Sequence, residues 1–189
     1  MTKYWDKPGP ENTLPTLEAA VERAEELGIR HLVVASNTGQ TVEPLIGRGF
    51  EIICVTHHSG YARPGENEMD EETRVQLTQQ GVKVLTTTHL LANVERAVTN
   101  RFGGLYPGGV ISLTLRMFGQ GTKVCLEIAT MALDAGMIPY GKEIIAIGGT
   151  GRGADTALVL EPDHAKDFFQ GQILEVICKP RRIRFRERG

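Results

Sequence analysis

Two short apolar runs constrain the fold of this chain more than any other feature of its sequence. The runs are His31-Leu32-Val33-Val34-Ala35 and Glu51-Ile52-Ile53-Cys54-Val55-Thr56, and neither shows the alternation of apolar and polar residues that marks a strand with one face in water. Continuous apolar runs of this length are typical of strands in parallel sheets, because helices cover both faces of such sheets. The sequence therefore predicts an α/β fold.

Helix and strand patterns alternate along the rest of the chain. Apolar residues at helical spacing follow Thr13 and stop at Gly28, which predicts a helix that buries Leu14, Leu17, Val21, Ala24 and Leu27. A second helix begins at the acidic segment 69–72, and we expect its Val75 and Leu77 to face the sheet. Further helices are predicted at 41–46, 91–100 and 122–135, the last of them deeply buried, and a glycine-rich loop is predicted at 101–109. Further strands are predicted at 82–88, 143–147, 156–160 and 173–178.

This order of elements predicts a three-layer α/β architecture, with a mostly parallel sheet of about six strands and helices on both faces. Only residues 148–155 join the strands at 143–147 and 156–160, whereas a parallel crossover needs about a dozen residues or more. We therefore expect an antiparallel pairing at one edge of the sheet. A chain of 189 residues that is 41% hydrophobic suits a single domain over residues 1–189.

Composition and charge argue against two classes of protein. No apolar run reaches the ~20 residues that span a bilayer and the N-terminus lacks a signal-peptide pattern, so we expect a cytoplasmic protein with no membrane segment. A net charge of −2 gives no general attraction for nucleic acid. The basic cluster at 179–188 is interpreted as an end that either improves solubility or contacts another subunit of a homo-oligomer. The cysteines lack pairing or metal-binding spacing and are predicted to be inert core thiols: Cys54, Cys125 and Cys178.

A polar hexad follows the first apolar run directly and is the leading candidate for a binding site. It consists of Ser36, Asn37, Thr38, Gly39, Gln40 and Thr41. Because a helix pattern follows it, its backbone N–H groups would lack partners and carry the positive end of the helix dipole, which favours a phosphate. The alternative is an ordinary polar helix cap without a ligand.

A second glycine-rich segment, Gly148 to Asp155, lies at the end of the strand at 143–147. Its glycines run into a strand rather than a helix and lack the spacing of a dinucleotide-binding fingerprint. A flexible turn remains, with Gly149, Thr150 and Gly151 beside Arg152, whose guanidinium could pair with a phosphate. The alternative is an ordinary turn with a solvated arginine.

The chain resembles the C-terminal α/β domain of pyruvate kinase, occurring without the catalytic barrel. The matching blocks are residues 19–28, 36–41, 128–138 and 140–149. In that family the loop matching 36–41 cradles a phosphate of a sugar-bisphosphate activator, and the loop matching 148–155 closes over the same effector. The family keeps its catalytic groups in the barrel, so the resemblance implies a phosphate-ligand site without pyruvate kinase activity.

Two insertions relative to that domain suggest a ligand larger than a sugar. They span 57–65 and about 102–120, and both are expected near the carboxyl ends of the strands, where open α/β sheets bind ligands. Free-standing domains of this kind resemble a group of microbial proteins of unassigned function, some of which hold flavin mononucleotide (FMN). The resemblance implies FMN as cofactor, and the insertion residues expected to contact it are His57, His58, Tyr61, Arg63, Met117, Phe118 and Gly119.

Two other functions remain open at this point. One is an allosteric sensor of a sugar phosphate or another phosphometabolite. The other is an enzyme acting on a phosphorylated small molecule, with His57, His58 or His89 moving a proton. No metal site is predicted, because neither His57 nor His58 has a cysteine or carboxylate at ligand spacing.

Overall fold

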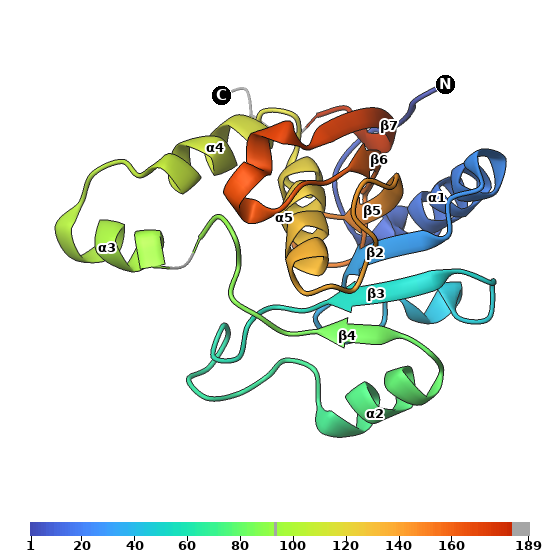
Figure 1. The fold of residues 1–189 in the computed structure, drawn as a ribbon, viewed down its shortest axis with the longest axis horizontal. Helices are drawn as coiled ribbons and strands as arrows, with labels where there is room; N and C mark the ends of the chain where they lie inside the picture. Colours follow the sequence, from blue (N-terminus) through green and yellow to red (C-terminus); the bar gives the residue numbers. More distant parts are fainter. Residues whose placement is uncertain (93, 183–189) are drawn as a thin grey trace.

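The apolar runs of the sequence form the strands of one mixed sheet, in a computed structural model that describes residues 1–92 and 94–182. Residues 183–189, which include most of the basic C-terminal cluster, lie outside the described residues. The strand order is β1-β7-β6-β5-β2-β3-β4 (Figure 1). The strands are β1 (Lys3–Trp5), β2 (His31–Ala35), β3 (Glu51–Val55), β4 (Lys83–Leu85), β5 (Ile144–Gly148), β6 (Thr156–Glu161) and β7 (Gln172–Pro180).

The strand pairing confirms the mostly parallel α/β sheet with an antiparallel part. Strand β2 runs parallel to β3 and β5, and β3 runs parallel to β4. Strand β6 is antiparallel to both β5 and β7, as the short connection 148–155 predicts. The strand beyond the six expected is β1, which pairs in parallel with β7 through Lys3 opposite Cys178. Its three residues are too few to show a sequence pattern.

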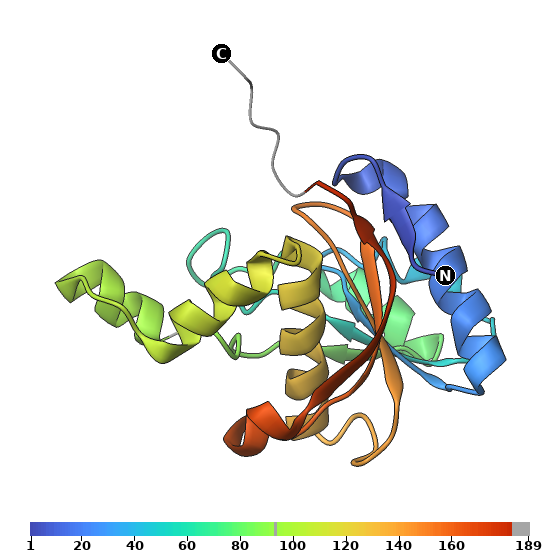
Figure 2. The ribbon, with the colours of Figure 1, turned by 90° about the horizontal axis from the view of Figure 1, so that it is seen from above.

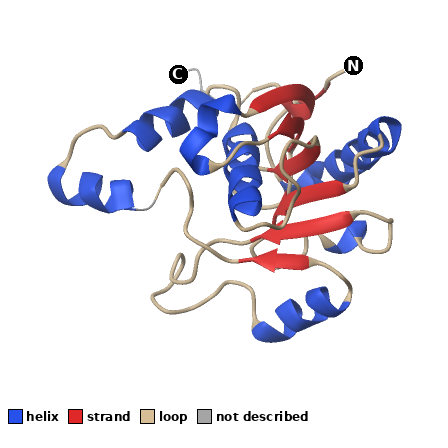
Figure 3. Ribbon diagram, in the orientation of Figure 1, coloured by secondary structure: helices blue, strands red, loops and turns tan. Residues whose placement is uncertain are grey.

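Helices cover both faces of this sheet (Figures 2 and 3). Alternate residues of β2 point to opposite faces, so Leu32 and Val34 join the apolar cluster under α1 (Thr13–Leu27) while Val33 joins the cluster under α5 (Gln120–Asp134). Helix α2 (Glu71–Gln79) lies on the same face as α1 and buries Leu77 there. The prediction of a deeply buried helix at 122–135 is confirmed by α5.

Three side chains expected in the core are exposed instead. Leu14 and Leu27 lie in the first and last turns of α1, and Leu17, Val21 and Ala24 between them are buried. In α2, Leu77 is buried but Val75 is exposed. Two residues apart on a helix point in nearly opposite directions, so Val75 and Leu77 could not both face the sheet.

Two connections differ from the sequence prediction. The segment 101–109 is mostly helical: α3 (Val94–Phe102) ends in it, and α4 (Pro107–Arg116) begins at Pro107, whose fixed φ suits a first helical position. Gly108 lies in the first turn of α4 close to the Glu95 side chain of α3, where a Cβ would make that flexible carboxylate shift. The predicted helix at 41–46 is only a short 3-10 turn, η2 (Glu43–Leu45), and two further 3-10 turns are η1 (Pro10–Asn12) and η3 (Ala165–Gln170). Of the helices in the described part of the chain, none has the length and apolar character to cross a bilayer.

Candidate functional site

The carboxyl ends of β2, β3 and β5 open into a cavity of about 750 Å³. The polar hexad forms one wall, the glycine segment after β5 forms another, and the loop after β3 forms a third. Helices α1 and α5 both begin at this cavity, since Thr13 and Gln120 line it, so the positive ends of two helix dipoles are directed there. Apolar side chains contribute the floor: Ala35, Val55, Val124, Ile128 and Met131.

The hexad loop is closed by its own side chain rather than by a helix. Ser36 Oγ accepts the N–H of Thr41 over 3.2 Å, and the residues that follow form only the short turn η2. The helix-dipole reason for a phosphate at this loop was therefore wrong. Another source of donors remains, because within the described residues no protein acceptor is found for the backbone N–H groups of Thr38, Gly39 and Gln40.

Helix α2 packs directly behind this loop. Gly39 has a φ of +88°, which favours glycine, and a Cβ at this position would lie 3.0 Å from Leu77 Cδ1. Glycine thus meets two requirements at once, the backbone conformation and the close approach of α2. The contact with α2 holds the loop in one shape from behind.

The glycine segment forms a tight second loop. Asp155 is buried, and its carboxylate accepts the N–H of Thr150 over 3.1 Å, while its own N–H donates to Gly148 O over 3.0 Å. A Cβ on Gly149 would collide with the carbonyl oxygen of Gly153, so the two arms of the loop touch. Arg152 lines the cavity at the tip, which places a guanidinium beside the hexad wall.

The third wall is a cluster of rings that we call the ring wall: His57, His58, Tyr61 and His89. The rings of His57 and Tyr61 are stacked with centroids 3.7 Å apart, and His89 lies 5.4 Å from His57 and 5.2 Å from His58. His57 Nδ1 lies 2.5 Å from Glu68 Oε2, and this hydrogen bond to the carboxylate fixes the orientation of the imidazole ring. With Nδ1–H donated to Glu68, Nε2 accepts from the Asn37 amide over 3.3 Å.

Within the ring wall, the pKa of His89 is strongly lowered. Burial lowers the pKa of His89 to about 4; Glu127 opposes this shift, while the positive charges of His57, Lys123 and His58 add to it. The imidazole is therefore neutral at neutral pH. Beneath it, Lys123 and Glu127 form a buried ion pair, and Glu127 Oε1 accepts the N–H of Leu91 over 2.8 Å. This pair anchors the segment that carries His89 to α5.

The structure brings most of the candidate residues together around the cavity. Those that line it are Ser36, Asn37, Thr38, Gln40, Thr41, His57, Tyr61, Gly149, Gly151 and Arg152. Gly39 and Thr150 belong to the same loops without lining the cavity. His58 stands behind the front rings, with Tyr61 at 5.6 Å.

Four candidates lie away from the cavity lining. Met117 and Phe118 are 75% and 60% exposed at the end of α4, and Gly119 caps the start of α5. The Arg63 side chain is exposed and pairs with Glu66 over 3.4 Å. Met117 and Phe118 were expected at the ligand because they lie in an insertion; they follow α4 just before Gln120, which lines the cavity, without lining it themselves.

Several lining residues carried no recognisable signal in the sequence. Glu68 looked like part of a solvated acidic segment, yet it orients His57. Val124, Ile128 and Met131 were interpreted as sheet-facing core, and their apolar side chains also form the cavity floor. Pro10 and Thr13 reach the cavity because the glycine segment docks on them, with Ala154 N–H donating to Thr13 Oγ1 over 3.0 Å.

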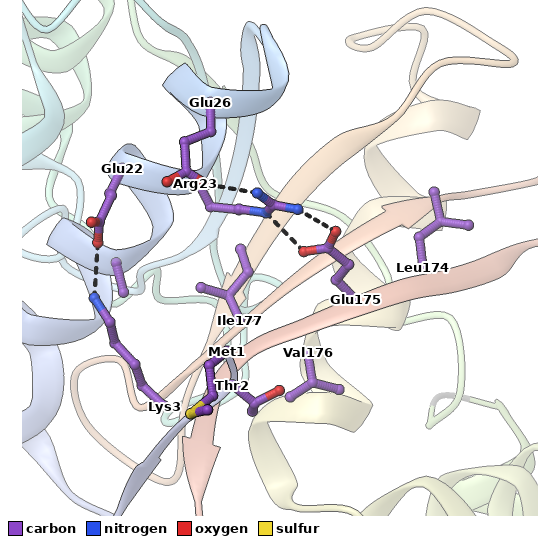
Figure 4. Close-up of a pocket in the computed structure, with 11 residues that line it drawn as sticks. Met1, Thr2, Lys3, Glu22, Arg23, Glu26, Leu174, Glu175, Val176 and Ile177 are labelled. Carbon is purple, nitrogen blue, oxygen red and sulfur yellow. Dashed lines mark hydrogen bonds and ion pairs between the residues drawn. The ribbon is translucent and has the colours of Figure 1, made fainter.

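A second cavity, of about 580 Å³, lies between β1, α1 and β7 (Figure 4). Its charged side chains are paired with one another: Arg23 binds both oxygens of Glu175 over 2.8 and 2.6 Å, and Lys3 binds Glu22 over 2.8 Å. These charges need no ligand to satisfy them. The cavity at the strand ends, with its unpaired backbone donors, is the better candidate site.

Comparison with known proteins finds a matching family model and a set of solved structures that match part of their own length. The family model of the pyruvate kinase α/β domain matches residues 15–160. A pyruvate kinase from Cryptosporidium parvum is 18% identical, with a TM-score of 0.38, and the match covers 73% of this chain and 20% of that chain. The Cryptosporidium parvum pyruvate kinase in complex with ADP is 18% identical, with a TM-score of 0.40 and coverage of 78% and 22%. The chain thus spans about a fifth of the length of these structures.

Proposed function

Because the chain belongs to the pyruvate kinase α/β domain family, we propose that it binds a phosphorylated small molecule at the ends of β2, β3 and β5, and that this ligand is FMN. One observation carries the proposal: anion donors, stacked rings and an apolar floor surround a single cavity of about 750 Å³. This volume falls within the ~300–1,000 Å³ of small-molecule sites.

The two loops supply the grip on the phosphate. Backbone N–H groups of 38–40 have no protein acceptor among the described residues, and Arg152 lines the same cavity. Each hydrogen bond between a charged group and a neutral donor contributes roughly 1.5–3 kcal/mol. Micromolar affinity requires about 8 kcal/mol in total, which three such bonds reach only at the top of this range, so the rest of the ligand must be buried as well.

The ring wall and the floor supply that burial. His57 and Tyr61 present stacked planar rings, and Val124, Ile128 and Met131 present an apolar surface from α5. A flavin ring has one planar face for stacking and an apolar edge for such a floor. A bound flavin would supply hydride or single-electron transfer. The residues of this chain would hold the phosphate, orient the ring and keep the His89 imidazole beside it neutral.

The test begins with the colour of the purified protein. Protein isolated without added cofactor should show the visible absorbance of a flavin, and added FMN should lose fluorescence on binding to any empty sites. Riboflavin, which lacks the phosphate, should bind at least ten-fold more weakly. Colourless protein that also leaves FMN fluorescence unchanged would reject FMN as the ligand.

A pair of arginine variants separates the phosphate grip from general charge. Arg152→Gln should weaken FMN binding about ten-fold and leave riboflavin binding unchanged, since one charged hydrogen bond is lost. Arg30→Gln removes the same charge from an exposed position beside the amino end of β2 and should change neither. Equal losses in both variants would point to nonspecific attraction.

A second candidate function is acid–base catalysis on a phosphorylated metabolite. The oriented His57 favours it, since Glu68 holds Nδ1 and a substrate that displaces the Asn37 amide would meet Nε2 as the proton acceptor. The test is turnover of a panel of sugar phosphates by the wild-type protein and by His57→Gln, with His31→Gln as control at the other end of the sheet. Turnover that survives in His57→Gln would reject this role. Colourless protein without turnover whose melting temperature rises with a sugar phosphate would favour a sensor instead.

A further inference from the structure

Helices α3 and α4 form an arm, residues 94–118, that projects from the sheet and its covering helices (Figures 1 and 2). None of the residues of α3 is buried, and the helix rests mainly on α4. The arm contributes little to the candidate site, since Met117 and Phe118 lie outside the cavity lining. Its role must be sought on its own surface.

That surface is rich in exposed apolar side chains. On α4, Val110, Leu113 and Met117 follow one another at intervals of three and four residues, so they form a single stripe along one face, and they are 47%, 57% and 75% exposed. Val94 and Phe102 of α3 are 76% and 77% exposed. The set that we call the arm patch is Val94, Phe102, Leu105, Val110, Leu113, Met117 and Phe118.

An exposed stripe of this kind is a feature of helices that pack against a partner. Helices as short as α3, with nine residues, are marginal in water and owe most of their stability to the burial of an apolar face. In the described residues, α3 has no such burial within its own chain. A covering surface would therefore stabilise the arm.

A shallow hollow on the same arm fits such a cover. The groove between α3 and α4 has a volume of about 510 Å³ and includes Leu91, Tyr106 and Leu113 in its lining, with Arg96 and Arg116 at the sides. The arm thus carries an apolar stripe on α4 beside a groove, with Leu113 at the border of both. A two-fold axis places the same patch against itself, which requires this combination of stripe and groove.

We propose that the arm patch is an interface between two copies of this chain, in which the α3–α4 hairpins pair as a four-helix arrangement. The size of the patch agrees with a dimer. Full burial of an aliphatic or aromatic side chain removes roughly 60–120 Å² of apolar surface. Since these seven are 47–81% exposed, two copies would bury roughly 500–1,100 Å² of apolar surface, which corresponds to roughly 900–1,900 Å² in total at the usual apolar share of an interface. Stable interfaces bury about 1,200–2,000 Å².

This interface is independent of the ligand proposed above, and its test is the mass of the protein in solution. Light scattering after gel filtration should give twice the chain mass for the wild type and one chain mass for Leu113→Glu/Met117→Glu. Glutamate is a good helix former, so α4 should persist in the variant, which circular dichroism checks. Val110→Gln, a milder change in the same stripe, should shift the dimer dissociation constant upward by about ten-fold.

The matched control is Phe169→Glu, which places the same charge on an apolar side chain that is 81% exposed in η3, far along the chain from the arm. It should remain a dimer. A wild-type protein that is monomeric at about 100 µM would overturn the proposal, as would a dimer that survives in Leu113→Glu/Met117→Glu. A dimer that Phe169→Glu alone disrupts would place the interface elsewhere.

Discussion

The side chain of Asn37 is joined to His57 across the ends of two neighbouring parallel strands. The His57 backbone N–H donates to Asn37 Oδ1 over 3.1 Å, and the Asn37 amide lies 3.3 Å from His57 Nε2. Asn37 belongs to the hexad loop after β2, and His57 begins the loop after β3. One asparagine therefore couples the phosphate wall of the cavity to its ring wall.

Replacing Asn37 should separate these two walls. Asn37→Ala removes both bonds and should lower the free energy of unfolding by about 1–2 kcal/mol, at roughly 1 kcal/mol for each bond. Asn37→Asp keeps the acceptor for the His57 N–H, so it should lose less stability, but its charge should weaken FMN binding more than alanine does. Urea unfolding and FMN fluorescence titration measure the two effects. The same order of variants in both measurements would contradict this coupling.

Because the pKa of His89 is lowered in the folded protein, the free energy of unfolding should depend on pH. The pKa of His89 is about 4 in the folded protein, against about 6.5 for an unperturbed histidine. Between these values the unfolded chain binds the extra proton, so stability is present above pH 6.5 and is lost as the pH falls toward 4. The full difference corresponds to about 3 kcal/mol, and partial solvent contact of the ring reduces our expectation to about 1–2 kcal/mol.

His89→Gln isolates this effect from other titrations. Urea unfolding at pH 4.5 and pH 7.5 should show a smaller loss of stability in the variant than in the wild type, because the other groups titrate in both. His164→Gln, a partly exposed histidine paired with Asp134, is the control and should follow the wild type. Parallel curves for wild type and His89→Gln would show that His89 is not the group responsible.

Removing one charge of the buried pair of Lys123 and Glu127 should lower the free energy of unfolding more than removing both charges. Both side chains are only 5% exposed, and burial lowers the pKa of Lys123. Lys123→Met leaves the Glu127 carboxylate buried without its cation, which should cost about 3–5 kcal/mol. Lys123→Met/Glu127→Gln removes both charges and keeps an acceptor for Leu91 N–H, so it should recover at least 1 kcal/mol of that loss. Chemical unfolding of the three proteins measures this, and a double variant no more stable than the single one would contradict it.

The fold could be predicted from the sequence wherever a local pattern had one structural meaning. The apolar runs of β2 and β3 indicate strands covered on both faces, and the short connection after β5 indicates an antiparallel partner. The glycines at 108 and 109 have two meanings, since they can break a helix or allow close helix packing. The structure places both glycines in α4, with Gly108 against Glu95 of α3, and a contact between two helices cannot be inferred from the local sequence.

The candidate site was predictable to a similar extent. The order of strands places the loops after β2 and β5 side by side, because β2 and β5 are neighbours in the sheet. The contact of Met117 and Phe118 with a ligand stays a prediction, because their exposed side chains lie outside the cavity lining and the course of α4 depends on packing rather than on sequence pattern. Glu68 was missed because its partner His57 is brought to it only by the folded loop.

The three cysteine thiols should be unreactive until the protein unfolds. Burial raises the pKa of Cys54 to about 12 and that of Cys178 to about 11, and it also raises the pKa of Cys125, so hardly any thiolate exists at pH 8. Cys54 Sγ donates to Ser36 O over 3.4 Å, which places this thiol directly beneath the hexad loop.

An aromatic disulfide reagent should therefore modify none of the three thiols in the native protein and all three in urea. Phe169→Cys, at an exposed position, is the positive control and should react within seconds to minutes under native conditions. Native reactivity of Cys54 alone would mean that the hexad loop opens without global unfolding. In that case FMN should slow the reaction in proportion to site occupancy, because a ligand that binds only the closed loop shifts the opening equilibrium by mass action.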